Sequence, residues 1–248
     1  MGRMIEIQSG EHVTIAYEAK PTGKVRGGIL LIHEVWGLAD HIKDVADRYA
    51  REGYLVVAPE LLAGVGINPE AVGTLNIDLF NPAKRNEAQP KLRKLMAPMQ
   101  SPEFGAATLE SLRHVFDYLF NHEDTAGQVA VVGYCFGGTY SYSLAIAEER
   151  LKAAIPYYGP CDAPVDELRR VSAPILAFYG ANDEGLVNGI DDLKERMSIA
   201  GVDFAAIVYP NCGHAFFNDG NPFSYNEVAA TDAYSQTLDF LDKHLALN

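Results

Sequence analysis

Residues 129–138 read V-A-V-V-G-Y-C-F-G-G, a small apolar run that ends in a lone cysteine flanked by glycines. Residues 133–137 match the pattern G-x-nucleophile-x-G, which marks a tight turn between a strand and a helix. Glycine suits these positions because neighbouring side chains would collide where the chain reverses. A helix N-terminus beside Cys135 would also stabilise a thiolate. The pattern therefore predicts an α/β fold whose turn presents Cys135, although a buried structural cysteine is an alternative.

Apolar runs of the same buried-strand type recur along the chain. They lie at 27–34, 54–60, 128–134, 153–159, 174–180 and 204–210. Between them lie helical patterns such as 41–52, which we expect Gly53 to cap, and a last helix at 228–246. Alternating strands and helices predict one mostly parallel sheet with helices on both faces. The first segments, 4–8 and 13–19, predict an antiparallel pair at its edge.

The rhythm of strand and helix is interrupted only at 61–105, which is rich in Pro, Gly and Asn and holds a basic cluster. A structureless loop of that length is uncommon, so we expect some helix and a lid-like covering role. The segment is too poor in core residues for a separate domain. We therefore expect residues 1–248 to form a single domain.

The composition disfavours several classes of partner. A net charge of −13 argues against nucleic acid and anionic membranes, whose phosphates repel an acidic protein. The N-terminal residues lack the apolar segment of a signal peptide, and no apolar run is long enough to span a membrane, so we expect a cytoplasmic protein. The three cysteines form no C-x-x-C pair, which disfavours a disulfide framework, and no metal site is predicted.

An acid and a histidine follow two later predicted strands. Asp183 comes just after 174–180, and His214 lies in the loop after 204–210. Taken singly, the first is typical of a capping residue and the second of a surface group. Together with Cys135 they follow the order nucleophile, acid, histidine, at strand ends where sites of α/β sheets form. This order predicts a Cys-His-Asp triad.

The dipeptide His33-Glu34 ends the strand expected beside that of Cys135. H-E-V-W-G lacks the second histidine of H-E-x-x-H, so a zinc protease is excluded. The loop after this strand commonly supplies a second oxyanion N–H, here from Val35, to complement that of Phe136. Glu34 would then point at the thiol, unless it is a solvated loop acid.

Six motifs together resemble the dienelactone hydrolase (carboxymethylenebutenolidase) family, in order over residues 5–245. They are H-E-V-W-G, A-P-E-L, G-Y-C-F-G-G, Y-Y-G, F-Y-G-A-N-D and G-H-A-F-F-N-D. The resemblance implies an α/β-hydrolase fold, a small ester or lactone substrate, and no metal or organic cofactor. It places the triad on Cys135, His214 and Asp183, and implies that Glu34 contacts the resting thiol and helps to generate the thiolate.

The substrate is less clear, because the sequence departs from the family pattern. Relatives acting on the chlorocatechol-pathway lactone place a carboxylate-binding arginine where this chain has Asn218. Arg85 and Arg93 are candidates for a second arginine of that kind. A further set of aromatic side chains is expected to line the pocket: Trp36, Tyr134 and Phe217.

Three alternatives stay open at this point. The first is a broad-specificity carboxylesterase or thioesterase acting on neutral esters, which the loss of the arginine favours. The second is a non-catalytic relative that binds a ligand. The third is an oxidation sensor that pairs Cys135 with Cys212, while Cys161 has no predicted role.

Overall fold

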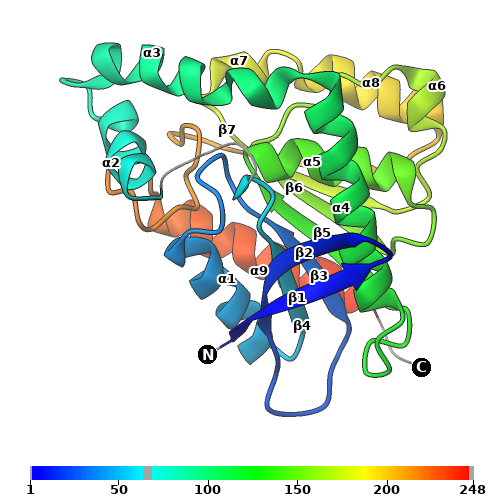
Figure 1. The fold of residues 1–248 in the computed structure, drawn as a ribbon. Helices are drawn as coiled ribbons and strands as arrows, with labels where there is room; N and C mark the ends of the chain where they lie inside the picture. Colours follow the sequence, from blue (N-terminus) through cyan, green and yellow to red (C-terminus); the bar gives the residue numbers. More distant parts are fainter. Residues whose placement is uncertain (1, 64–68, 246–248) are drawn as a thin grey trace.

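The structure is a computed structural model that describes residues 2–63 and 69–245. Its centre is an eight-stranded sheet in the order β1-β2-β4-β3-β5-β6-β7-β8 (Figure 1). The strands are β1 Arg3–Ser9, β2 His12–Ala19, β3 Gly28–Ile32, β4 Leu55–Pro59, β5 Val129–Tyr134, β6 Ala153–Tyr157, β7 Ile175–Gly180 and β8 Phe204–Tyr209. All residues of β3, β4, β5, β6 and β7 are buried, as their apolar sequences require.

The pairing of the strands follows the prediction. β1 and β2 form an antiparallel pair, and β2 joins the sheet antiparallel to β4. From β4 through β8 every pair is parallel, so the carboxyl ends of these strands meet at one edge. The predicted α/β fold and its antiparallel edge pair are therefore confirmed.

Helices cover both faces of the sheet (Figure 1). They are α1 Asp40–Arg51, α2 Pro69–Phe80, α3 Arg85–Met96, η2 Ala97–Gln100, α4 Pro102–Phe120, α5 Phe136–Ala147, α6 Val165–Leu168, α7 Glu184–Val187, α8 Ile190–Ala200 and α9 Glu227–His244. The buried side chains of α1 and α9 pack into the core on one face of the sheet. Those of α4, α5 and α8 pack into the core on the opposite face. No helix in the described ranges is both long and apolar enough to cross a membrane.

Two helix ends differ slightly from the prediction. α1 ends at Arg51 with Glu52 as its C-cap, and Gly53 follows with φ +100 rather than forming the cap itself. That backbone conformation favours glycine, which explains why the sequence has a glycine one residue after the observed C-cap. The last helix begins at Glu227 and ends at His244, while residue 246 lies outside the described residues.

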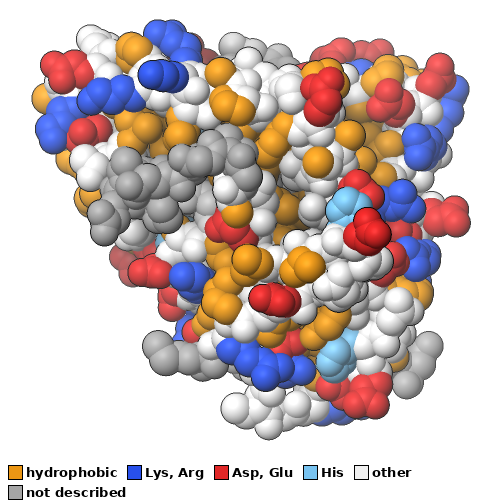
Figure 2. Space-filling view, in the orientation of Figure 1, with side chains coloured by type: hydrophobic (Ala, Val, Ile, Leu, Met, Phe, Trp, Pro, Cys, Tyr) orange, Lys and Arg blue, Asp and Glu red, His pale blue; other side chains and the backbone are white. Residues whose placement is uncertain are grey.

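The irregular segment 61–105 contains the expected helix, in α2, α3 and η2, although its residues 64–68 lie outside the described part. Figure 1 shows α3 lying across the edge of the sheet at which the parallel strands end. Lysine and arginine side chains gather over α3 at the upper left of Figure 2, so the basic cluster of this segment is on the surface.

Candidate active site

Cys135 is the single residue between β5 and α5, and its backbone conformation is unusual. Its φ is 56° and its ψ is −108°, a region that non-glycine residues rarely adopt. The Cys135 N–H donates to the Tyr157 carbonyl at 3.0 Å, and its own carbonyl accepts from the Thr139 N–H at 3.2 Å. Both bonds hold the turn in place. Such strain persists where the surroundings over-determine it, commonly at functional sites.

The glycines of the turn are needed for space. A Cβ atom on Gly133 would lie 2.0 Å from the Gly137 carbonyl oxygen, and one on Gly137 would lie 2.2 Å from the Ile32 carbonyl oxygen. Gly133 therefore allows the strand to meet the helix that follows it. Gly137 allows that helix to approach β3.

Asp183 and His214 meet at the ends of β7 and β8. The Asp183 Oδ2 atom lies 2.6 Å from the His214 Nδ1 atom. The two loops are also joined by the Asn182 N–H, which donates to the Cys212 carbonyl at 2.8 Å. Because an ionised carboxylate only accepts, Nδ1 carries the proton and Nε2 is left for another partner. Cys135 and His214 line the same cavity.

The charge state of His214 depends on both neighbours. Burial favours the neutral ring, but the negative charge of the Cys135 thiolate and the hydrogen bond to Asp183 outweigh it. Together they hold the pKa of His214 well above its usual 6.5. The side chain of His214 is nevertheless 33% exposed, so solvent can reach the ring. The arrangement favours the protonated form of His214.

The N–H groups of Val35 and Phe136 have no hydrogen-bond partner among the described residues. Both residues line a cavity together with Cys135. The loop of Val35 is tied to the turn by the Gly137 N–H, which donates to the His33 carbonyl at 3.1 Å. These two residues are the predicted oxyanion donors, and the structure brings them together at the thiol.

His33 positions this loop. Its Nε2 accepts from the Leu61 N–H at 3.2 Å, so its Nδ1 carries the proton and donates to the Glu34 carbonyl at 2.6 Å. Burial lowers the pKa of His33, in keeping with the neutral tautomer that these two bonds require. His33 is therefore a structural residue of the site.

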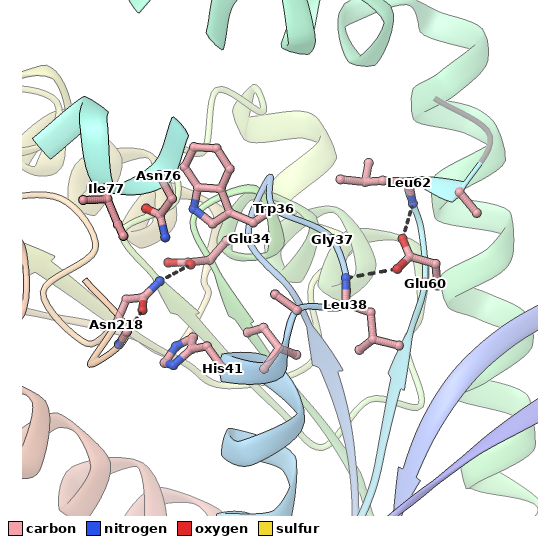
Figure 3. A pocket seen from close by; sticks show the side chains of 14 residues that line it. Glu34, Trp36, Gly37, Leu38, His41, Glu60, Leu62, Asn76, Ile77 and Asn218 are labelled. Atoms are coloured by element: carbon pink, nitrogen blue, oxygen red, sulfur yellow. Dashed lines mark hydrogen bonds between the residues drawn. The ribbon is translucent and has the colours of Figure 1, made fainter. Parts of the chain in front are cut away.

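Glu34 is buried, with only 2% of its surface exposed, and is not a solvated loop acid. Its Oε2 accepts from Asn218 Nδ2 at 2.6 Å (Figure 3), and its Oε1 accepts from the Tyr158 hydroxyl at 3.3 Å. Within the described residues no hydrogen bond joins it to Cys135, and the contact with the resting thiol stays a prediction. Burial raises the pKa of Glu34, although His41 and His214 oppose this.

Tyr158 is a site residue that the sequence analysis did not identify. Its ring centroid lies 5.1 Å from that of His214, and its hydroxyl binds Glu34. It also lines a cavity with Cys135 and has an unusual φ of 38°. The signal that could have found it is its place directly after β6, at the same edge of the sheet as the other site residues.

Two cavities meet at the thiol, of about 740 and 480 Å³. Cys135, His214, Val35 and Met96 line both of them, so the thiol lies between two spaces. The larger cavity is also bounded by side chains of α2 and α3: Leu79, Phe80, Arg85, Gln89 and Leu92.

Of the predicted pocket residues, Trp36 and Arg85 line the larger cavity. Arg93 is exposed on α3 and is not among its lining residues.

Tyr134 and Phe217 lie in the core instead of the pocket wall. They are 0% and 3% exposed, and their ring centroids are 5.0 Å apart. The Tyr134 hydroxyl lies 3.2 Å from that of Tyr49 on α1. Because successive strand residues point to opposite faces, Tyr134 faces the core of α1 and α9 while the next residue forms the turn.

All three cysteines are free thiols, and Cys161 and Cys212 are buried. Burial raises the pKa of both buried thiols, which keeps them protonated and unreactive. Among the described residues no group of three His, Cys, Asp or Glu side chains could hold a metal ion.

Comparison with known proteins agrees with this geometry. The model of the dienelactone hydrolase family matches residues 15–245. A Yersinia pestis protein named "Putative carboxymethylenebutenolidase" is 31% identical over 242 residues, which cover 92% of this chain and 83% of that protein. A Saccharolobus solfataricus protein of the same name is 30% identical and covers 86% of this chain and 88% of its own.

A solved structure leads to the same family. The crystal structure titled "Putative Dienelactone Hydrolase" from Klebsiella pneumoniae superimposes with a TM-score of 0.81 at 27% identity, covering 98% of both chains.

Proposed function

The chain belongs to the dienelactone hydrolase family of carboxylic ester hydrolases, and on that premise we propose that it cleaves esters or lactones through Cys135, His214 and Asp183. The strained conformation of Cys135 at the head of α5 is the observation that carries most weight. A buried structural cysteine needs no such turn, and a ligand-binding protein needs no histidine paired with an acid beside it.

The first half of the reaction acylates the sulfur. The Cys135 thiolate attacks the carbonyl carbon, a C–S bond forms, and the carbonyl electrons move onto oxygen. The N–H groups of Val35 and Phe136 stabilise this oxyanion. The tetrahedral intermediate then collapses, the C–O bond of the ester breaks, and the leaving alkoxide takes the proton of the His214 imidazolium. The products are an alcohol and a thioester on Cys135.

The second half hydrolyses the thioester. Neutral His214, oriented by Asp183, takes a proton from water as the water oxygen attacks the acyl carbon. Collapse of the second tetrahedral intermediate breaks the C–S bond and releases the carboxylic acid. The thiolate and imidazolium are thereby restored.

One observation favours esters without a carboxylate over an anionic lactone. Asn218 occupies the expected arginine position and is engaged by Glu34, so it supplies no positive charge. Apart from His214 of the triad, Arg85 is the cation among the described lining residues of the larger cavity, and it is exposed. Because solvent screens an exposed charge, Arg85 would contribute little to the selection of an anionic substrate. A carboxylated dienelactone is therefore the second candidate substrate.

We further propose that the chain forms one domain, in which the stretch from α2 to η2 covers the thiol. Side chains from this stretch line both cavities at Cys135, among them Leu92 from α3 and Met99 from η2. Such a cover would limit the access of bulk water to the thioester, so that hydrolysis depends on a water molecule activated by His214.

The test is steady-state hydrolysis of p-nitrophenyl acetate and of a carboxylated dienelactone by the wild type and by Cys135→Ala. We expect the variant to lose at least about 10³-fold in kcat on both substrates. Wild-type rates in the variant would reject the nucleophile and favour a binding role. The ratio of the two wild-type kcat/KM values then separates the general esterase from the lactone hydrolase.

A further inference from the structure

A separate cavity of about 500 Å³ has Glu34 and Trp36 in its wall (Figure 3). It shares these two residues with the larger cavity at Cys135, but neither Cys135 nor His214 is among its lining residues. Most of the wall is apolar and comes from α1, α2 and the loops after β3 and β4: Leu38, Ala39, Ile42, Leu62, Ala63 and Ile77.

Several polar side chains of this wall are engaged by protein partners. Glu60 accepts from the Leu38 N–H at 3.0 Å and from the Leu62 N–H at 2.9 Å (Figure 3). Asn218 donates to Glu34, and the Asn76 side-chain oxygen accepts from Asn221 Nδ2 at 3.0 Å. These interactions hold the polar side chains of the wall in place.

His41 is the exception. Its side chain is only 10% exposed, and its Nε2 is a buried atom with no hydrogen-bond partner among the described residues. A buried polar atom of this kind costs free energy, so its persistence calls for an explanation. Because His41 lines the cavity, a ligand there can supply the missing partner.

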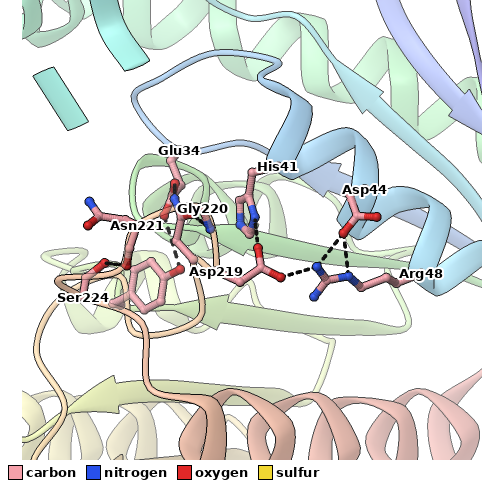
Figure 4. Close-up of polar contacts among 10 residues, drawn as sticks. Glu34, His41, Asp44, Arg48, Asp219, Gly220, Asn221 and Ser224 are labelled. Atoms are coloured by element: carbon pink, nitrogen blue, oxygen red, sulfur yellow. Dashed lines mark hydrogen bonds and ion pairs between the residues drawn. The ribbon is translucent and has the colours of Figure 1, made fainter. Parts of the chain in front are cut away.

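The other ring nitrogen of His41 is fixed in its role. Nδ1 lies 3.0 Å from Asp219 Oδ1, and Asp219 is also paired with Arg48, which Asp44 holds from the other side (Figure 4). The hydrogen bond from His41 and the charge of Arg48 hold the pKa of Asp219 far below its ordinary value. Asp219 is thus an ionised acceptor, Nδ1 carries a proton, and Nε2 is the atom offered to the cavity.

We propose that this cavity binds a small uncharged molecule with an apolar body and a hydroxyl group, which forms a hydrogen bond with His41 Nε2. A hydroxyl both donates and accepts, so it fits Nε2 in either protonation state of the ring. A carboxylate would face Glu34 and Glu60, and an ammonium ion would have to lose its hydration in an apolar space. The site does not depend on the proposed catalysis.

Four compounds of similar size test the site by calorimetric titration: benzyl alcohol, toluene, benzoate and benzylamine as its ammonium ion. We expect benzyl alcohol to bind about fivefold more tightly than toluene, the factor that one neutral hydrogen bond typically supplies. His41→Phe should remove that difference while toluene still binds. His12→Phe, at an exposed histidine at the start of β2, is the matched control and should keep the difference.

Nitrogen-detected NMR of the wild-type imidazoles gives a second readout that does not depend on a folded variant. Benzyl alcohol should shift the Nε2 resonance of His41 and leave that of His214 unchanged. Three results would each overturn the proposal: tighter binding of benzoate or benzylammonium, an undiminished preference in His41→Phe, or loss of binding after alkylation of Cys135. If Cys135→Ala still hydrolyses esters, the proposed function fails but this binding result stands.

Discussion

At the scale of single residues, Cys135 and His214 are coupled by charge. The thiolate is the largest of the influences that raise the pKa of His214. In the proposed reaction, acylation turns the thiolate into a neutral thioester and removes this influence. The pKa of His214 must therefore fall at the moment when the reaction needs a neutral base to activate water.

This coupling predicts a lower pKa for His214 in Cys135→Ala than in the wild type, measured by NMR titration of the ring. In the wild type the imidazolium should persist to higher pH, because both the thiolate and Asp183 stabilise it. Asp183→Asn should also lower the pKa, since it removes the other stabilising partner. An unchanged titration in Cys135→Ala would contradict the coupling.

The raised pKa also fixes the sign of the pH dependence of stability. The stabilisation that protonated His214 gains on folding is complete below its unfolded pKa near 6.5. It is lost as the pH rises through the higher folded value. Over that window, the free energy of unfolding of the wild type should fall relative to that of Asp183→Asn, in which Cys135 is unchanged, measured by urea denaturation. A difference that does not vary with pH would count against the ion pair.

At the scale of elements, the junction of β5 and α5 depends on close backbone packing. Gly133→Ala would place a Cβ atom 2.0 Å from the Gly137 carbonyl oxygen. Since that atom belongs to the backbone, the turn itself must shift, and we expect a loss of about 3 kcal/mol or more in the free energy of unfolding. Denaturant titration measures this loss.

Gly185→Ala on α7 is the matched control, because no heavy atom lies within 4 Å of the place that its Cβ atom would take. Its stability should be unchanged or slightly raised, since alanine favours helix. Equal stability of Gly133→Ala and the wild type would show that the turn is looser than the structure describes.

Much of the sheet was predictable because each central strand is a short apolar run buried on both faces. The places of Cys135, Asp183 and His214 followed from the rule that sites form at the carboxyl ends of parallel strands. The partners of Glu34 did not follow. Its bond to Asn218 joins residues 184 positions apart and depends on how two loops meet, which no local pattern encodes.

At the scale of the whole molecule, α2, α3 and η2 contribute side chains to the cavities at the thiol. Their fold was hard to predict, because α3 carries Pro90 inside a strongly polar sequence and buries only Ala88. Two of its apolar side chains, Leu92 and Met96, line a cavity at the site. A helix that lines a pocket lacks the continuous apolar stripe of a core helix.

Arg85 and Arg93 lie on the same helix. Comparing them distinguishes a direct contact with the substrate carboxylate from a long-range effect of positive charge. Arg85 lines the larger cavity, whereas Arg93 does not. Arg85→Gln should lower kcat/KM for a carboxylated dienelactone by about threefold to tenfold and leave p-nitrophenyl acetate unaffected, since an exposed charge contributes modestly. Arg93→Gln is the control and should change neither. Equal effects of both variants would indicate long-range electrostatic attraction of the substrate instead of a direct contact with Arg85.

The acyl-enzyme itself tests the central claim most directly. Wild-type protein is mixed with p-nitrophenyl acetate, quenched in acid within one turnover, digested and analysed by mass spectrometry, with Cys135→Ala as the control. We predict one acetyl group on the peptide that carries Cys135, appearing with the burst of nitrophenol, decaying at the turnover rate and absent from the variant. Turnover with no acetyl group on Cys135, or with acetyl on another residue that decays at the turnover rate, would contradict the account.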